Sequence, residues 1–370
     1  MNLLATKGLR PPSRGAAIVP SQKAQEPVGA DQILDSIVSH FGDWDRNHNG
    51  QISWSEMRAN VGDAGIQGEE AVSLATLYAL VQHDASYRGL IRKAPVTVDR
   101  IYDLHLEYDV YDTGDDFGRP VVEAFHEKYS EKLSQSAPEL FPQGMPSAHK
   151  IQQGLAPSCG FLSVTYAQAS RDPESVRKAI QETPDGVLVS FPGLDKPIET
   201  TLPTDTERAL FATAEENGSW LATLEKAWGI HQSKNNPDAA FEMSTYPEEA
   251  ITAWTTEGGV TTRVPKNSKP YRKGEVPWFL RTSKRTLENG GTVIAWTKFD
   301  EINYDDFVTG HAYTLTDIDS AQGTVSLRNP WGRKEPLNEN GQPIDGVDDG
   351  AFTLSMEDFQ GAFLKIARQT

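Results

Sequence analysis

The chain has 370 residues, 38% of them hydrophobic and 24% charged, which is enough for two or three domains with buried cores. Its formal net charge of −17 argues against nucleic acid as the main partner, because phosphate binding needs basic patches. No apolar run approaches the roughly 18 residues that a membrane-spanning helix needs. A single cysteine excludes an internal disulfide, and the first residues lack a secretory signal pattern, so we expect a cytoplasmic protein.

The N-terminal third begins with a segment of low complexity. Residues 1–29 are rich in Pro, Gly, Ser and Ala and show no period, which predicts a disordered tail. Residues 30–105 then predict a small all-α domain in which a helix, a loop and a second helix follow one another. The first helix is indicated by apolar residues at helical spacing, Ile33, Leu34, Ile37, Val38 and Phe41.

The loop between these helices, DRNHNGQISWSE at 45–56, matches the calcium-binding EF-hand pattern at every position. Gly50 supplies the sharp turn, and Ile52 supplies the short strand that pairs with a partner loop. The expected ligands are oxygen atoms of Asp45, Asn47, Asn49, Gln51 (through its backbone carbonyl), Ser53 and Glu56. The loop therefore predicts Ca²⁺ as a bound ion, and the other reading is a polar turn that binds nothing.

A second, degenerate loop is expected to begin at Asp84, because EF-hands usually pair. In that register Gly89 stands at position 6 and Ile91 at position 8. Arg88 at position 5 and Pro95 at position 12 exclude metal binding there. The acidic residues Asp112, Asp115 and Asp116 match no full loop and are read as a solvated face.

The remaining chain predicts an α+β body. Residues 106–147 form an acidic linker and a helix, and two lobes follow at 148–245 and 246–370. Strand-like runs occur at 186–191, 291–299, 311–319, 323–329 and 350–355, and helix-like runs at 159–170, 219–230, 278–289 and 356–366.

The only cysteine, Cys159, opens a predicted helix in QQGLAPSCGFLS. The positive end of a helix dipole and exposed N–H groups favour a thiolate there. Gln153, six residues earlier, is placed to bring its amide next to the sulfur. A lone cysteine is more often a small buried side chain, so this position alone does not indicate catalysis.

Two later stretches add the partners that a thiol protease needs. TGHAYTLTDI places His311 at the start of a strand, and LRNPWGRKE places Asn329 between a strand and a turn. Cys, His and Asn in this chain order are what a papain-type protease uses. The thiolate attacks a carbonyl, the imidazolium protonates the leaving amine, and the amide orients the imidazole. Gln153 and the backbone N–H of Cys159 would stabilise the oxyanion.

At these residues the sequence resembles the calpain family of cysteine proteases. The family motifs Q-G-x-x-G-D-C-W, G-H-A-Y and R-N-P-W-G appear here as QGLAPSCG, GHAY and RNPWG. GSWLATLEKAW and DDGAFTLSMEDF resemble two further family segments, and the resemblance covers about residues 150–367. It implies a two-lobed papain-like core, with Cys159 as nucleophile, His311 as acid/base and Asn329 as the orienting amide. It also implies that Trp331 shields the His–Asn hydrogen bond from water.

Some positions depart from the family pattern. Gly160 stands where the family has Trp, and Ser158 where it has Asp. A calcium site in the family's core uses an acidic D-G-E segment, in which Ala351 here replaces the Glu while Asp349 is kept.

From the motifs and the 45–56 loop together, we expect a calcium-dependent cysteine endopeptidase that cleaves protein substrates at limited sites. A calcium-sensing scaffold without activity and a cysteine acyltransferase remain as alternatives.

Overall fold

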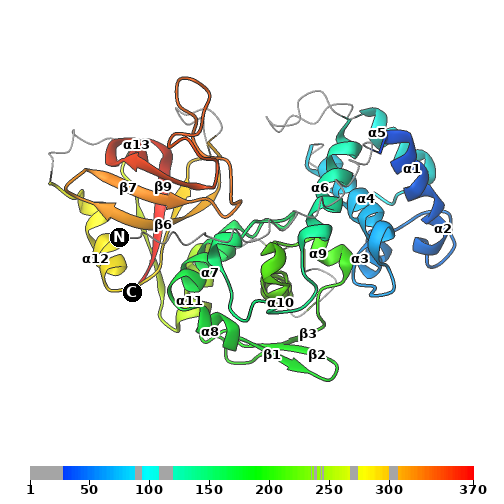
Figure 1. The fold of residues 1–370 in the computed structure, drawn as a ribbon, viewed down its shortest axis with the longest axis horizontal. Helices are drawn as coiled ribbons and strands as arrows, with labels where there is room; N and C mark the ends of the chain where they lie inside the picture. The colour runs from blue at the N-terminus through cyan, green and yellow to red at the C-terminus, as the bar shows by residue number, and fades with distance from the viewer. Residues whose placement is uncertain are drawn as a thin grey trace, which may run out of the picture.

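The computed structural model describes residues 28–87, 94–107, 120–234, 236, 240–241, 243, 246–266, 274–299 and 307–370. The predicted tail, apart from its last two residues, and the acidic residues 112–116 lie outside this part of the chain. The described elements follow one another in an arc, with the N-terminal helices at one end and a β-sheet lobe at the other (Figure 1). Among the described residues, no helix is both long and apolar enough to cross a membrane.

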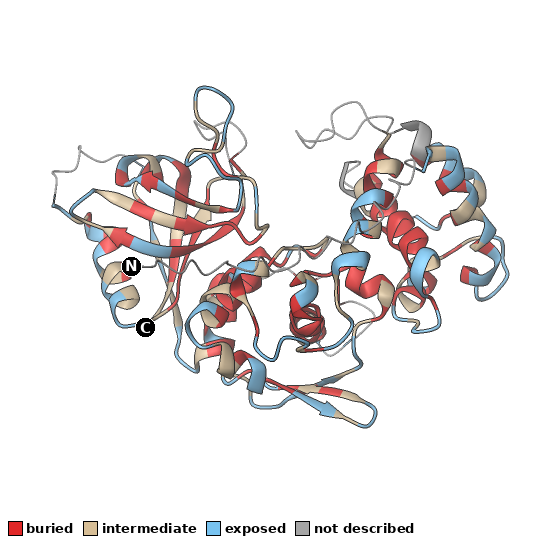
Figure 2. Cartoon of the chain, viewed as in Figure 1, coloured by how far each residue is buried: buried red, intermediate tan, exposed pale blue. Residues whose placement is uncertain are grey.

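The N-terminal helices pack around one central helix, α4. They are α1 (Ala30–Ser39), α2 (Phe41–Trp44), α3 (Trp54–Val61), α4 (Gly68–Tyr87), α5 (Val98–Glu107) and α6 (Val121–Gln135). α4 is buried on most of its circumference, as Figure 2 shows. A helix that is apolar on all sides is a core helix, and here α1, α3, α5 and α6 surround it.

The loop 45–56 pairs with a later segment, but in a different register from the predicted one. Ile52 and Val96 form an antiparallel bridge, with N···O distances of 2.8 and 2.9 Å. Asp84 does not open a loop: it lies in α4 and makes an ion pair with Arg100 at 2.9 Å. The predicted register from Asp84 is therefore wrong, because α4 continues to Tyr87 and moves the pairing position from Ile91 to Val96.

The first lobe is mainly helical. It contains α7 (Cys159–Arg171), α8 (Pro173–Lys178), α9 (Asp205–Leu210), α10 (Trp220–Gln232) and α11 (Pro247–Thr255), with 3-10 turns η1 (Ala148–Lys150) and η2 (Glu215–Asn217). An antiparallel sheet of β1 (Ile180–Thr183), β2 (Gly186–Val189) and β3 (Ile198–Thr200) lies at its edge. Trp254 and Ile251 of α11 belong to the same buried cluster as the core of this lobe.

The second lobe is a six-stranded antiparallel sheet in the order β4-β9-β5-β6-β7-β8. Its strands are β4 (Gly259–Arg263), β5 (Val293–Thr297), β6 (Ala312–Asp319), β7 (Thr324–Arg328), β8 (Ala351–Ser355) and β9 (Phe363–Gln369), and its helices α12 (Trp278–Glu288) and α13 (Met356–Ala362). The predicted helix at 356–366 is wrong beyond Ala362. The last residues instead form β9, because pairing with β4 and β5 buries Phe363, Ile366 and Ala367.

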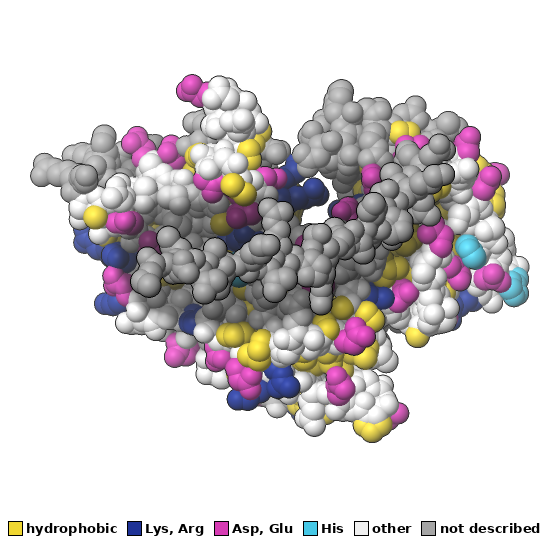
Figure 3. Space-filling view, in the orientation of Figure 1, with side chains coloured by type: hydrophobic (Ala, Val, Ile, Leu, Met, Phe, Trp, Pro, Cys, Tyr) yellow, Lys and Arg dark blue, Asp and Glu magenta, His cyan; other side chains and the backbone are white. Residues whose placement is uncertain are grey.

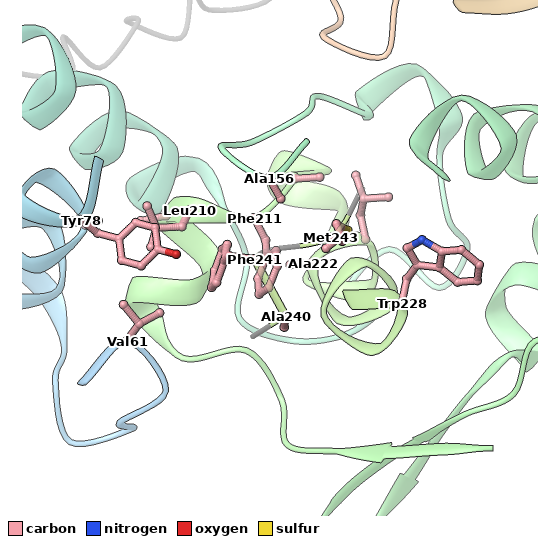
Figure 4. Close-up of a cluster of buried hydrophobic side chains, with 14 of the residues drawn as sticks. Val61, Tyr78, Ala156, Leu210, Phe211, Ala222, Trp228, Ala240, Phe241 and Met243 are labelled. Atoms are coloured by element: carbon pink, nitrogen blue, oxygen red, sulfur yellow. The ribbon is translucent and has the colours of Figure 1, made fainter. Parts of the chain in front are cut away.

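The N-terminal helices and the first lobe share one hydrophobic core. The cluster of buried side chains that begins at Ile33 continues through Tyr78 and Phe211 to Trp254. Figure 4 shows the junction, where Tyr78 of α4 points toward Phe241 and Phe211. Hydrogen bonds from Thr204 Oγ1 to the Val61 carbonyl (2.7 Å) and from the Gly68 N–H to Asp205 (3.0 Å) add to this contact. The expected small all-α domain is thus packed directly onto the lobe that holds the cysteine.

Candidate active site

Cys159 is the first residue of α7, as predicted, and only 8% of its surface is exposed. The helix begins there because Ser158 is the N-cap and its carbonyl accepts the N–H of Leu162 at 2.9 Å. The sulfur is near the N–H groups of Gly160 and of its own residue, and near that of Ala312 in the second lobe. The thiol therefore lies where the two lobes meet.

Two side-chain hydrogen bonds join α7 to β6 just beyond the cysteine. Ser163 Oγ donates to the carbonyl of Ala312 (3.2 Å), and Thr314 Oγ1 donates to the carbonyl of Ser163 (2.8 Å). Because His311 directly precedes Ala312, this contact holds the start of β6, and with it the histidine, beside the N-terminal turn of α7.

His311 and Asn329 are joined in the second lobe. The Nε2 atom of His311 lies 2.9 Å from Oδ1 of Asn329, and both side chains are buried. Asn329 directly follows β7, and its Nδ2 group donates to the Lys334 carbonyl (2.9 Å), which fixes the amide so that its oxygen faces the imidazole. With Nε2 donating to the amide, the neutral ring leaves Nδ1 as its acceptor.

Trp331 covers this pair. Its ring centroid lies 5.0 Å from that of His311, at an interplanar angle of 59°. Its backbone N–H also donates to Asn329 Oδ1 at 3.0 Å. The tryptophan thus contacts both partners of the His–Asn hydrogen bond, the imidazole through its ring and the amide oxygen through its backbone N–H.

The turn that carries Asn329 and Trp331 rests on the segment that carries Gln153. The Gln153 N–H donates to the carbonyl of Pro330 at 2.9 Å. Gly332, at φ +70°, lies against this segment so closely that a Cβ would come within 2.9 Å of Gln152 Cγ. Glycine is needed here both for the left-handed backbone and for the close approach.

Gln153 lies in the segment before the cysteine, and its side-chain amide is already engaged. Nε2 donates to the Ala156 carbonyl at 2.8 Å, while Oε1 is buried and makes no hydrogen bond among the described residues. An amide nitrogen carries two hydrogens, so one N–H remains for a second acceptor.

Burial sets the resting protonation of the cysteine and the histidine. It raises the pKa of the Cys159 thiol, and the nearby N–H groups of Ala312, Gly160 and Cys159 offset this only in part. Burial also lowers the pKa of His311 to about 4, against a smaller upward effect of the Asn329 hydrogen bond. Burial thus outweighs the effect of the helix terminus on the thiol, and it favours the uncharged form of both groups.

Glu335, six residues after Asn329, is a site residue that the sequence analysis did not identify. It is 1% exposed, and its Oε1 accepts the N–H groups of Asp349 (3.0 Å) and Gly350 (2.7 Å), while Oε2 makes no hydrogen bond among the described residues. Burial and the charges of Asp345 and Asp349 raise the pKa of Glu335 to about 7. A loop brings these acids together, and spacing alone gave no signal for it.

The loop 45–56 is held by hydrogen bonds among its own residues. Asp45 accepts the N–H groups of Asn49 (3.2 Å) and Gly50 (2.7 Å), and Gly50 has φ +83°. Ser53 and Glu56 form a reciprocal capping box at the start of α3. Hydrogen bonds from Ser53 lower the pKa of Glu56 and keep its carboxylate ionised.

The six predicted ligand residues lie together in this loop and offer oxygen donors of the kind that Ca²⁺ prefers. Asn47 and Glu56 are in direct contact, with Nδ2 donating to Oε1 at 2.6 Å. Across the described part of the chain, no three His, Cys, Asp or Glu side chains gather as a metal-binding group. The loop has only two carboxylates, and amide, carbonyl and hydroxyl oxygens complete its donor set.

Cysteine, histidine and asparagine in this arrangement are the residue types that define the papain-type thiol proteases. A model described as calpain family cysteine protease matches residues 122–368, and the chain belongs to this family. The calpain-like protease palB/RIM13 of Debaryomyces hansenii is 28% identical over 195 residues. That alignment covers 49% of this chain and 24% of the relative, so the chain matches about a quarter of the relative's length.

Proposed function

We propose that the chain is a calcium-dependent, calpain-like cysteine endopeptidase that cleaves protein substrates at limited sites. The observation that supports the catalytic part is the buried 2.9 Å contact between His311 and Asn329, covered by Trp331, since His311 directly precedes Ala312, whose N–H lies near the sulfur of Cys159. An orienting amide and a shield are needed only if the imidazole must hold one tautomer for proton transfer.

In this mechanism Cys159 supplies the nucleophile. As the sulfur attacks the scissile carbonyl, its proton passes to Nδ1 of His311, and the imidazolium then gives this proton to the leaving amine. The free N–H of Gln153 and the backbone N–H of Cys159 bind the oxyanion. Water, activated by His311, finally hydrolyses the thioester and restores the thiol.

Burial favours the uncharged forms of the Cys159 thiol and the His311 imidazole, and this preference is compatible with the proposed mechanism. Because burial disfavours both the thiolate and the imidazolium, charge separation has to occur when substrate and the oxyanion donors are in place. Activity therefore depends on how the two lobes close around the site. A regulator can change activity by changing that closure.

We propose that Ca²⁺ acts through the loop 45–56, as an EF-hand paired with the degenerate loop that contains Val96. The fit of the donor set, the capping box and the Ile52–Val96 bridge support this assignment. Held by Asp45, Glu56 and the intervening oxygens, the ion would neutralise the loop's carboxylates and fix the angle between α2 and α3.

A series of aromatic contacts leads from this loop to the first lobe. The ring centroid of Trp54, the residue after Ser53, lies 4.8 Å from that of Tyr78. The centroids of Tyr78 and Phe241 are 5.6 Å apart. Phe241 stacks on Phe211 at 3.8 Å (Figure 4). A change in the angle of α3 would therefore act on packed side chains of the lobe that holds Cys159.

The test is hydrolysis of casein across a calcium titration, with Cys159→Ala and Glu56→Gln in parallel. We expect calcium-dependent cleavage that is lost in Cys159→Ala and needs more calcium in Glu56→Gln. Gln67→Glu, outside the loop, is a matched surface control. Cleavage that is equal with calcium and with chelator would keep the protease and remove the calcium part of the proposal.

A scaffold without protease activity is the second candidate, and the burial of Cys159 together with Gly160 in place of Trp favours it. Alkylation of Cys159 by iodoacetamide at neutral pH separates the two. Labelling that is slowed by His311→Ala supports the protease, because a coupled imidazole accelerates thiolate formation. A sulfur that reacts only after unfolding supports the scaffold.

A further inference from the structure

A buried carboxylate lies directly behind the nucleophile. Glu225 of α10 is fully buried, and its Oε1 accepts a hydrogen bond from the hydroxyl of Ser158, the residue before Cys159. Its Oε2 accepts the N–H of Ala212 at 2.5 Å. Both oxygens of this carboxylate are thus used to fasten two loops, one of which leads into the catalytic helix.

A lysine from the N-terminal helices approaches the same place. Lys132 of α6 reaches inward and donates to the carbonyl of Phe211, the neighbour of Ala212. Burial lowers the pKa of Lys132, and burial raises that of Glu225, while the opposite charge of each partner counteracts the shift in the other. The two groups therefore bracket the Phe211–Ala212 backbone from opposite sides.

This arrangement has a physical cost that packing alone does not explain. A carboxylate without an opposite charge is expensive to bury, and an apolar residue at 225 would avoid that expense. The charges that surround it come from several elements: Lys132 and Lys128 lie on α6, and the adjacent Lys226 is already paired with Glu207 of α9 at 2.7 Å. Lys132 is thus the cation that the site uses for Glu225.

We propose that Glu225 is a positioning residue for Cys159, that it acts through Ser158, and that Lys132 completes it. Helix α6, which carries Lys132, then helps to position Cys159 and does not serve only as a linker. Ser158 stands at the N-cap of α7, so its anchor sets where the first turn, and with it the sulfur, lies relative to Ala312 and His311. This inference rests on the proposed role of Cys159 as the reactive thiol.

The experiment compares two buried charge pairs that share helix α10. Glu225→Gln and Lys132→Met alter the proposed couple, and Glu207→Gln and Lys226→Met alter the neighbouring pair, which does not touch Ser158. Each variant is measured in the full chain for thermal unfolding and for the rate of Cys159 alkylation by iodoacetamide between pH 5 and 9. Casein hydrolysis is measured separately as kcat and KM.

We expect Glu225→Gln and Lys132→Met to slow alkylation of the folded protein by about tenfold and to lower kcat more than they raise KM, because a shift of the thiol affects the reacting geometry. The double variant should lose less than the product of the single losses. The wild type should show an inflection near pH 7 that Glu225→Gln lacks and Glu207→Gln keeps.

Ser158→Ala tests the same link without a change in charge, and it serves if the Glu225 variants do not fold. It should slow alkylation, while Ser170→Ala, at an exposed position near the far end of α7, should leave the rate unchanged. The proposal is overturned if the Glu225 and Lys132 variants lose only thermal stability, as the control pair does, with an unchanged pH profile of alkylation. Alkylation does not require turnover, so a chain that fails to cleave casein still decides this question.

Discussion

The two lobes that meet at Cys159 are built differently, and the difference identifies where regulation can enter. The cysteine lobe is helical and shares one continuous core with the N-terminal helices, from Ile33 to Trp254. The lobe of His311 and Asn329 is a six-stranded sheet whose own core is formed around Tyr313, Phe359 and Ile366. A change in the N-terminal helices is therefore transmitted by packing to the cysteine lobe, and the same cluster reaches the sheet at Ile294, Ala312 and Ala367.

The surface does not divide in the same way. In Figure 3, Asp and Glu side chains are scattered over the described part of the visible face and are not gathered on one lobe. The two lobes thus differ in their internal packing, and each of the following substitutions tests that difference.

The largest effect is expected from Phe211→Ala, which truncates a fully buried ring at the junction of the N-terminal helices and the first lobe. We expect a loss of about 3–5 kcal/mol in the free energy of unfolding. Hydrogen exchange should increase in α4 and α10 together and less in β7. The matched change in the other core, Phe359→Ala, should have the reverse pattern, and equal exchange in both lobes would contradict the two-core description.

Asn329→Ala removes the amide that orients His311. We expect kcat to fall about 100-fold, with a smaller change in KM, because the imidazole loses its fixed tautomer but the substrate cleft is kept. Ser326→Ala, on the exposed face of the same strand, is the control. If Asn329→Ala retains wild-type kcat in peptide hydrolysis, the residue is only part of the turn.

His311 should make the second lobe sensitive to acid. Burial lowers its pKa to about 4 from the ordinary 6.5, so between these values the unfolded chain binds more protons and stability falls as the pH falls. The contribution that is present above pH 6.5 should be reduced by about 2 kcal/mol at pH 5. Urea unfolding at pH 7.5 and 5.0 should show this extra loss in the wild type and not in His311→Gln.

The smallest effect is expected from Ser53→Ala, which removes half of the capping box at α3. The loss should be about 1 kcal/mol without calcium. Calcium affinity should fall modestly, since this residue contributes one of six donors. Ser355→Ala, at the N-cap of α13 in the second lobe, should cause a similar loss of stability and leave the calcium titration unchanged; an equal shift in both variants would show that the effect is not local.

Much of the second lobe could be predicted from the chain, because its strands are short runs rich in β-branched and aromatic residues. The strand-like runs at 291–299, 311–319, 323–329 and 350–355 correspond to β5, β6, β7 and β8. The helix-like runs that begin at Cys159, Ser219 and Trp278 correspond to α7, α10 and α12. By contrast, the sequence predicts helix for the first residues of β9, since they follow a short helix without a turn signal and become a strand only between two partners.

The chain alone identifies Cys159, His311 and Asn329 in their order and the oxygen donors of the 45–56 loop, because these are local chemical patterns. The folded arrangement is needed for the register of Val96 against Ile52, the shared core of the N-terminal helices, and the burial of Glu225 behind Ser158. It is also needed for the raised pKa of Cys159 and the lowered pKa of His311, because desolvation depends on what surrounds a group in space and not on its neighbours along the chain.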